Sequence, residues 1–152
     1  MTEIRRPAPG IHAAGQPTPD QLAALAGDGV RTVINLRAPD EPTEFDEAAV
    51  AEALGLRYVC IPVSGPGDVT HDTVEIFSRE LERARDEGDV LVHCASANRV
   101  GALLALDHGL TRGASREDAL SLGRAGGLVS LEPVVDDLLR EGRPDKTMEP
   151  SP

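Results

Sequence analysis

One stretch decides the fold of this chain: Asp89-Val-Leu-Val-His-Cys-Ala-Ser-Ala-Asn-Arg-Val-Gly101. The uninterrupted apolar run 90–92 predicts a strand that is buried on both faces, and the apolar residues 100–106 predict a helix. Cys94 therefore follows the end of a buried strand, and residues 95–98 form a tight loop before Arg99 opens the helix. Backbone N–H groups converge at the start of a helix with the positive end of its dipole, so we expect this loop to bind an anion.

Cys94 is the candidate nucleophile of this loop. Loop amides and a nearby guanidinium stabilise a thiolate, and the guanidinium of Arg99 offers a planar fork of donors to an oxyanion. The plain alternative is that Cys94 is a small buried hydrophobe, which is common for a free cysteine. A core cysteine does not require an arginine at the start of the following helix, so the pattern favours chemistry over packing alone.

The motif resembles the signature of the cysteine-dependent protein tyrosine and dual-specificity phosphatases. It is most similar to their small bacterial members, such as the phosphatase-like domain of beta-lactamase-hydrolase-like proteins. The resemblance covers roughly residues 10–110 and includes three upstream stretches and one acidic residue: Gly15-Gln16-Pro17, Val33-Ile34-Asn35-Leu36-Arg37, Ile61-Pro62-Val63 and Glu41.

The resemblance implies a phosphatase that hydrolyses a phosphomonoester through a phosphocysteine intermediate and needs no cofactor. It implies that Cys94 attacks phosphorus, that Arg99 holds the phosphoryl oxygens, and that His93 orients the loop through backbone contacts. The residues implied to bind phosphate are Ala95, Ser96, Ala97, Asn98 and Arg99.

The loop also departs from the family pattern in three ways. Four residues separate Cys94 from Arg99, whereas the phosphatases usually have five, and the shorter spacing is similar to the loop of rhodanese-type sulfurtransferases. Val100 stands where phosphatases usually carry a hydroxyl that helps the thiolate to leave, and Ala97 stands where related loops place glycine. Two alternatives to a phosphatase therefore stay open: a sulfurtransferase with a Cys94 persulfide, and an anion-binding module without turnover.

A phosphatase also needs a general acid, and Asp68 is the candidate. It lies in a loop rich in glycine and proline that follows a predicted strand and can move. An aspartate beside glycine is also an ordinary turn residue, and the chain has 26 acidic residues, so both interpretations stay open. Arg37 and Glu41 are expected to line the mouth of the pocket, or else to form an exposed ion pair.

Strands and helices alternate along the rest of the chain. We expect strands over 11–14, 30–36, 57–63 and 90–92, and helices capped by Thr18, Thr43, Thr70, Ser115 and Ser130. This order predicts an α/β domain over 10–140, with a mainly parallel sheet of about four strands flanked by helices. A loose lead over 1–9 and a frayed tail over 141–152 are expected to flank it. Ligands of such sheets gather beyond the carboxyl ends of the strands, where Arg37, Ser64 and Cys94 fall.

Composition limits the possible partners. A net charge of −11 argues against nucleic acid and anionic membranes, which require clustered basic residues. The resemblance implies a phosphorylated small molecule or phosphoprotein as the partner. No apolar run has the length of a signal peptide or a membrane span, so we expect a cytoplasmic protein. The histidines show no metal-ligand spacing, and a disulfide between Cys60 and Cys94 would need Cα atoms within about 7 Å.

Overall fold

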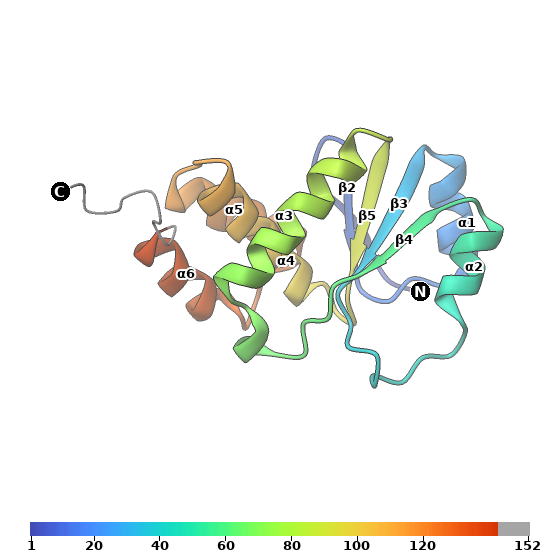
Figure 1. Cartoon of the computed structure of the whole chain (residues 1–152), viewed down its shortest axis with the longest axis horizontal. Coiled ribbons are helices and arrows are strands. Elements are labelled where there is room, and N and C mark those ends of the chain that lie inside the picture. Colours follow the sequence, from blue (N-terminus) through green and yellow to red (C-terminus); the bar gives the residue numbers. More distant parts are fainter. Residues whose placement is uncertain (143–152) are drawn as a thin grey trace.

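The computed structural model describes residues 1–142 and shows one five-stranded sheet flanked by helices (Figure 1). The strands are β1 (Ile4–Ala8), β2 (Ile11–Ala14), β3 (Val30–Asn35), β4 (Arg57–Cys60) and β5 (Asp89–His93). Their order in the sheet is β1-β2-β5-β3-β4, and every pair is parallel except β1 with β2. The predicted α/β fold with a mainly parallel sheet is confirmed, with five strands rather than about four.

Helices cover both faces of the sheet. They are α1 (Pro19–Gly27), α2 (Glu47–Ala53), α3 (His71–Arg85), α4 (Asn98–Leu106), α5 (Arg116–Gly126) and α6 (Glu132–Glu141). A 3₁₀ turn at Pro66–Asp68 precedes α3, and a π-helical turn at Asp107–Thr111 continues α4. In Figure 1, α1 and α2 lie on one side of the sheet, and α3 to α6 lie on the other.

The central strand β5 is buried on both faces, as its apolar run predicts. Val90 and Val92 belong to the core shared with α3, α4, α5 and α6, whereas Leu91 packs in the smaller core under α1 and α2. All three side chains are fully buried. Burying apolar surface contributes about 25 cal/mol per Å², so alternate residues of this strand fix both helical layers to the sheet.

Three of the predicted helix caps are confirmed. Thr18 forms the complete capping box with Gln21, and the side chains of Thr70 and Ser115 accept the expected backbone N–H groups. Two predictions are wrong. Asp46, rather than Thr43, caps α2, so the loop after β3 is three residues longer. The N-cap residue of α6 is Leu131 rather than Ser130, and its apolar side chain cannot accept a backbone N–H.

The predicted loose lead over 1–9 is corrected by β1. Ile4 and Arg5 pair with Ala14 and Ala13, and Ala8 pairs with Ile11, with an irregularity between Arg5 and Ala8. Pro7 lies in that irregularity on an edge strand, where its missing N–H costs no ladder bond. Of the predicted tail, Glu141 ends α6, and residues 143–152 lie outside the described residues. Between residues 1 and 142, no helix is long and apolar enough to cross a membrane.

The sheet separates the two cysteines. Asn35 of β3 pairs with Cys60 on one side and with His93 on the other, so Cys60 lies two strands away from the end of β5. Two strand spacings amount to about 9–10 Å, which exceeds the Cα separation that a disulfide can bridge. The structure therefore excludes a disulfide between Cys60 and Cys94 without a rearrangement of the sheet.

Candidate active site

Three segments meet at the carboxyl edge of the sheet. The Leu36 N–H donates to the His93 carbonyl over 2.9 Å, and the Val63 N–H donates to the Leu36 carbonyl over 2.9 Å. The first bond continues the pairing of β3 with β5, and the second continues the pairing of β3 with β4 past the ends of those strands. They place the segments that carry Arg37, Ser64 and Cys94 side by side, as the topology of a parallel sheet predicts.

The loop after β5 places Cys94 beneath its rim. The Cys94 side chain is fully buried, whereas Ala95 and Ser96 are exposed. Ala97 has a φ of 74° and precedes α4, which begins at Asn98, one residue earlier than predicted. Cys94 therefore lies within one turn of the start of α4, where free backbone N–H groups and the helix dipole favour an anion.

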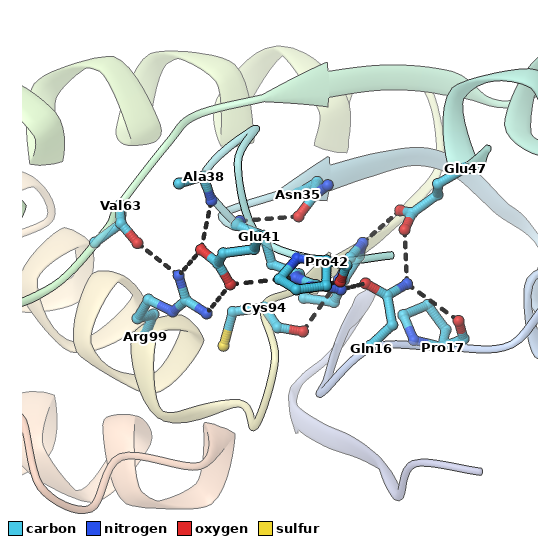
Figure 2. Close-up of polar contacts among 12 residues, drawn as sticks. Gln16, Pro17, Asn35, Ala38, Glu41, Pro42, Glu47, Val63, Cys94 and Arg99 are labelled. Atoms are coloured by element: carbon cyan, nitrogen blue, oxygen red, sulfur yellow. Dashed lines mark hydrogen bonds and ion pairs between the residues drawn. The ribbon is translucent and has the colours of Figure 1, made fainter. Parts of the chain in front are cut away.

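Arg99 is held by Glu41, which is 58 residues away in the sequence. The Arg99 Nη1 donates to one Glu41 oxygen over 2.7 Å and Nη2 donates to the other over 2.9 Å, while Nη1 also donates to the Val63 carbonyl over 2.7 Å (Figure 2). The hydrogen bond from Arg99 lowers the pKa of Glu41 from 4.5 to about 2, with contributions from the Ala38 N–H and Arg37. The pair therefore stays ionised at any pH at which the protein would be assayed.

Glu41 occupies only one edge of the guanidinium. An arginine has five N–H donors, and Glu41 and Val63 use three of them. Among residues 1–142, no hydrogen bond takes the Nε–H or the second N–H of Nη2, and these two donors form the other fork of the group. Figure 2 shows the Cys94 sulfur beside this guanidinium, and the hydrogen bond to Glu41 and the proximity of Cys94 both raise the pKa of Arg99.

Arg37 lies behind Glu41 rather than at an exposed pocket mouth. Its side chain is only 9% exposed, and its Nε donates to Glu41 over 3.3 Å. Its two Nη groups donate to the Gln16 side chain and to the Pro42 carbonyl. Arg37 therefore fixes the loop that carries Glu41: the expected ion pair forms, but its arginine is buried rather than exposed.

Gln16 and Glu47 extend the network to the strand that precedes the thiol. The Gln16 Nε2 donates to Glu47 over 2.7 Å, and the other Glu47 oxygen lies in hydrogen-bonding contact with His93 Nε2. Sequence reasoning missed Glu47, because an acidic residue in the first turn of a helix is ordinary. Its contact with His93 spans 46 residues, so no local pattern in the sequence could have found it.

Asp68 lies on the segment that leaves Val63, in the 3₁₀ turn, and is exposed. Its carboxylate accepts the Ser64 N–H over 2.8 Å. No hydrogen bond within residues 1–142 joins it to Cys94 or Arg99. The carbonyl that starts this loop is nevertheless bonded to Arg99, so the loop and the guanidinium are connected directly.

The side chains of Asn98 and Val100 point away from the expected anion. The Asn98 amide oxygen accepts the N–H groups of Val129 and Leu131, and its Nδ2 donates to the Ser130 hydroxyl over 2.7 Å. Asn98 therefore ties the α5–α6 connection to the loop through its side chain. Val100 is fully buried in the core.

We expect Ala97→Gly to stabilise the protein by about 0.5–1 kcal/mol, because an L-residue pays for a left-handed backbone and glycine does not. Urea unfolding measures the change. Ala102→Gly, in the right-handed interior of α4, is the matched control and should destabilise by about 1 kcal/mol. Equal losses of stability in the two variants would show that the backbone at Ala97 carries no strain.

Comparison with known proteins points to one group. The sequence profile of the phosphatase-like domain of beta-lactamase hydrolase-like proteins matches residues 3–111. The beta-lactamase hydrolase-like protein of Xylella fastidiosa strain Temecula1 is 36% identical over 118 residues, which are 75% of this chain and 27% of that protein. The corresponding protein of Agrobacterium fabrum is 32% identical over the same shares. The chain thus spans about a quarter of the length of these curated relatives.

The fold is similar to that of solved phosphatase structures. TpbA of Pseudomonas aeruginosa, crystallised as a cysteine-to-serine variant in complex with pTyr, superposes with a TM-score of 0.71 at 20% identity. That match covers 93% of this chain and 89% of TpbA. A glycine-to-alanine mutant form of Tk-PTP gives a TM-score of 0.73 at 19% identity, over 91% and 95% of the two chains. At these identities the similarity shows a common fold.

Proposed function

This chain belongs to the family of the phosphatase-like domain of beta-lactamase hydrolase-like proteins, and from that premise we propose that it is a cysteine-dependent phosphatase for a phosphomonoester. One observation carries the proposal. The Arg99 guanidinium is held on one edge by Glu41 and Val63, which leaves a second fork of two donors beside a buried cysteine. A paired planar donor is the group that proteins use to grip phosphoryl oxygens.

In the proposed reaction, the Cys94 thiolate attacks phosphorus, so that a sulfur–phosphorus bond forms as the bond to the leaving oxygen breaks. The amides of residues 95–99 and the outer fork of Arg99 stabilise the charge on the transferring group. Water then releases inorganic phosphate from sulfur and regenerates the thiolate. The complex of TpbA with pTyr supports a phosphorylated substrate for this chain too.

Asp68 is the proposed general acid, and it acts as base in the second step. The loop that carries it begins at Val63, whose carbonyl accepts a hydrogen bond from Arg99, so the loop starts beside the guanidinium. Its carboxylate must exchange the Ser64 N–H for the leaving oxygen.

The net charge of −11 repels a phosphorylated substrate at long range, so a small ligand or one with its own positive groups fits best.

Sulfur transfer is the second candidate function. Only four residues separate Cys94 from Arg99, and the Asp68 carboxylate is engaged by a backbone N–H rather than directed at the thiol. A persulfide on Cys94 would need no general acid. The loop amides and Arg99 would then stabilise a sulfur anion in place of a phosphoryl group.

Two assays with one variant separate these functions. We expect the protein to release phosphate from an aryl phosphate, with a rate that falls at high pH as the general acid loses its proton. In Asp68→Asn the rate should drop and the fall at high pH should disappear. Asp72→Asn, an exposed acid at the start of α3, is the matched control and should keep the parent profile.

The Glu41–Arg99 ion pair cannot cause the expected fall of the rate at high pH. The Glu41–Arg99 pair stays ionised throughout the assay range, so it adds no inflection there. Transfer of sulfur from thiosulfate to cyanide, unaffected by Asp68→Asn and without phosphate release, would reject the phosphatase and favour the second function. Inactivity in both assays would leave an anion-binding module.

A further inference from the structure

A buried acid–base pair lies directly behind the thiol. His93 is fully buried and Glu47 is 6% exposed, so water does not screen the contact between them. The His93 Nε2 faces a Glu47 oxygen within hydrogen-bonding distance, and its Nδ1 lies 3.3 Å from the Cys94 carbonyl oxygen. The reaction described above assigns no chemical step to Glu47.

The partners of His93 determine how many protons the pair holds. A carbonyl oxygen only accepts, so the Nδ1 of His93 must carry a proton to bond to Cys94. The Nε2 faces a carboxyl oxygen, and a second proton must lie between them, since two lone pairs in contact would repel each other. If both contacts of the His93 ring are hydrogen bonds, the Glu47–His93 pair holds one proton more than a neutral imidazole and a carboxylate hold together.

Gln16 indicates which partner holds that proton. Its Oε1 accepts from Arg37, so its Nε2 is the group that faces Glu47, over 2.7 Å, and Pro17, over 3.1 Å. Figure 2 shows Gln16 between Glu47 and the loop that carries Glu41. Both Glu47 oxygens thus receive hydrogen bonds, which favours a carboxylate and leaves the second proton on the His93 ring.

We propose that Glu47 is a positioning residue that keeps His93 as an imidazolium, so that a fixed positive charge at the Cys94 carbonyl stabilises the thiolate. The inference rests on the proposed role of Cys94 as nucleophile, which phosphoryl transfer and sulfur transfer share. Because Glu47 lies on the far side of the ring, its negative charge offsets only part of the effect of the imidazolium.

The other charged groups around the pair do not titrate with it. Arg99 and Glu41 form an ion pair in front of the thiol, and Arg37 bonds to Glu41 and Gln16. Tyr58 faces Glu47 from β4, and burial raises its pKa, an effect that the charge of Glu47 increases. Tyr58 is therefore a neutral phenol, and Glu47 and His93 are the groups whose charges the test changes.

The rate of Cys94 alkylation by iodoacetamide against pH tests the proposal without any turnover. In Glu47→Gln we expect the pH midpoint of alkylation to move upward by about 0.5–1 unit, so that alkylation at pH 7 slows by about three- to tenfold. Glu52→Gln, on the exposed face of α2, is the matched control and should match the parent. In Glu47→Gln/His93→Asn the effects should not add, because both substitutions remove the same charge.

Nitrogen NMR of the parent protein provides a second measurement that does not depend on a variant folding. The His93 ring, identified by the signals that His93→Asn lacks, should show both nitrogens protonated at pH 7. A neutral ring at pH 7, or a Glu47→Gln variant that folds and alkylates like the parent, would overturn the proposal. Because neither measurement needs phosphate release, failure of the phosphatase assay would leave this result standing.

Discussion

Replacing Cys94 by serine is expected to lower kcat/KM for an aryl phosphate by about 10⁴-fold or more. A serine hydroxyl at this position has no adjacent base to ionise it, whereas a thiolate is nucleophilic at neutral pH. The loop amides and Arg99 remain in place, so the variant should still bind inorganic phosphate. Initial rates at low substrate concentration measure the loss.

The matched control for this substitution is Cys60→Ser. Cys60 is exposed on the edge strand β4 and is separated from the thiol by β3. The Cys60→Ser variant should therefore retain the rate of the parent protein. If Cys94→Ser kept more than a few per cent of the activity, or if Cys60→Ser lost it, Cys94 could not be the nucleophile.

Replacing Arg99 by lysine should lower kcat by about 10²–10³-fold, the usual cost of removing one preorganised donor from a site of developing charge. An ammonium is a point charge with three donors, so it cannot bond to Glu41 and Val63 while it also presents a fork to the phosphoryl group. Because lysine keeps the positive charge, a loss of kcat would show that the planar arrangement of the arginine donors matters. Steady-state kinetics with an aryl phosphate measures it.

Arg79→Lys serves as the control, since Arg79 pairs with Glu75 on the exposed face of α3.

The second substitution of interest is Glu41→Gln, which leaves Arg99 charged but removes the carboxylate that orients it. It should lower kcat as well, by less than Arg99→Lys. A faster Glu41→Gln variant would mean that Glu41 blocks the arginine rather than positions it.

Local signals in the sequence were sufficient for most of the scaffold. The capping box at Thr18, the caps at Thr70 and Ser115, and the doubly buried strand β5 all depend on residues that are close in sequence. The edge strand β1 was missed because Pro7 interrupts its pattern, and only its pairing with β2 reveals it. A strand that depends on a partner for its stability has a weak local signature.

The contacts of the site also fall into those that are local in the sequence and those that span many residues. Cys94 and Arg99 lie five residues apart, so a strand, a loop and a helix start were enough to bring them together. The bonds from Arg99 to Glu41 and from His93 to Glu47 span 58 and 46 residues. No local rule gives such pairs. The resemblance drew attention to Glu41, whereas Glu47 became visible only when the helix start at Asp46 was seen beside the loop.

The backbone of Ala97 shows how far sequence reasoning reached within the loop. An alanine in place of glycine raised the question of whether the position requires a positive φ, and the structure answers with 74°. The contact of Ala97 with the α5–α6 connection was not foreseen. A Cβ on Gly127 would lie 2.5 Å from the Ala97 methyl group, so the glycine at 127 accommodates the alanine at 97.

The most direct test of a cysteine-dependent phosphatase is to trap the phosphocysteine on Cys94. Val100 supplies no hydroxyl to the departing sulfur, so the phosphocysteine should form faster than it breaks down. The protein, mixed with an aryl phosphate, denatured rapidly and analysed by mass spectrometry, should carry one phosphoryl group on the peptide that contains Cys94 and none on that of Cys60. An unmodified Cys94 after this treatment, together with an added sulfur atom on Cys94 after treatment with thiosulfate, would contradict a cysteine-dependent phosphatase.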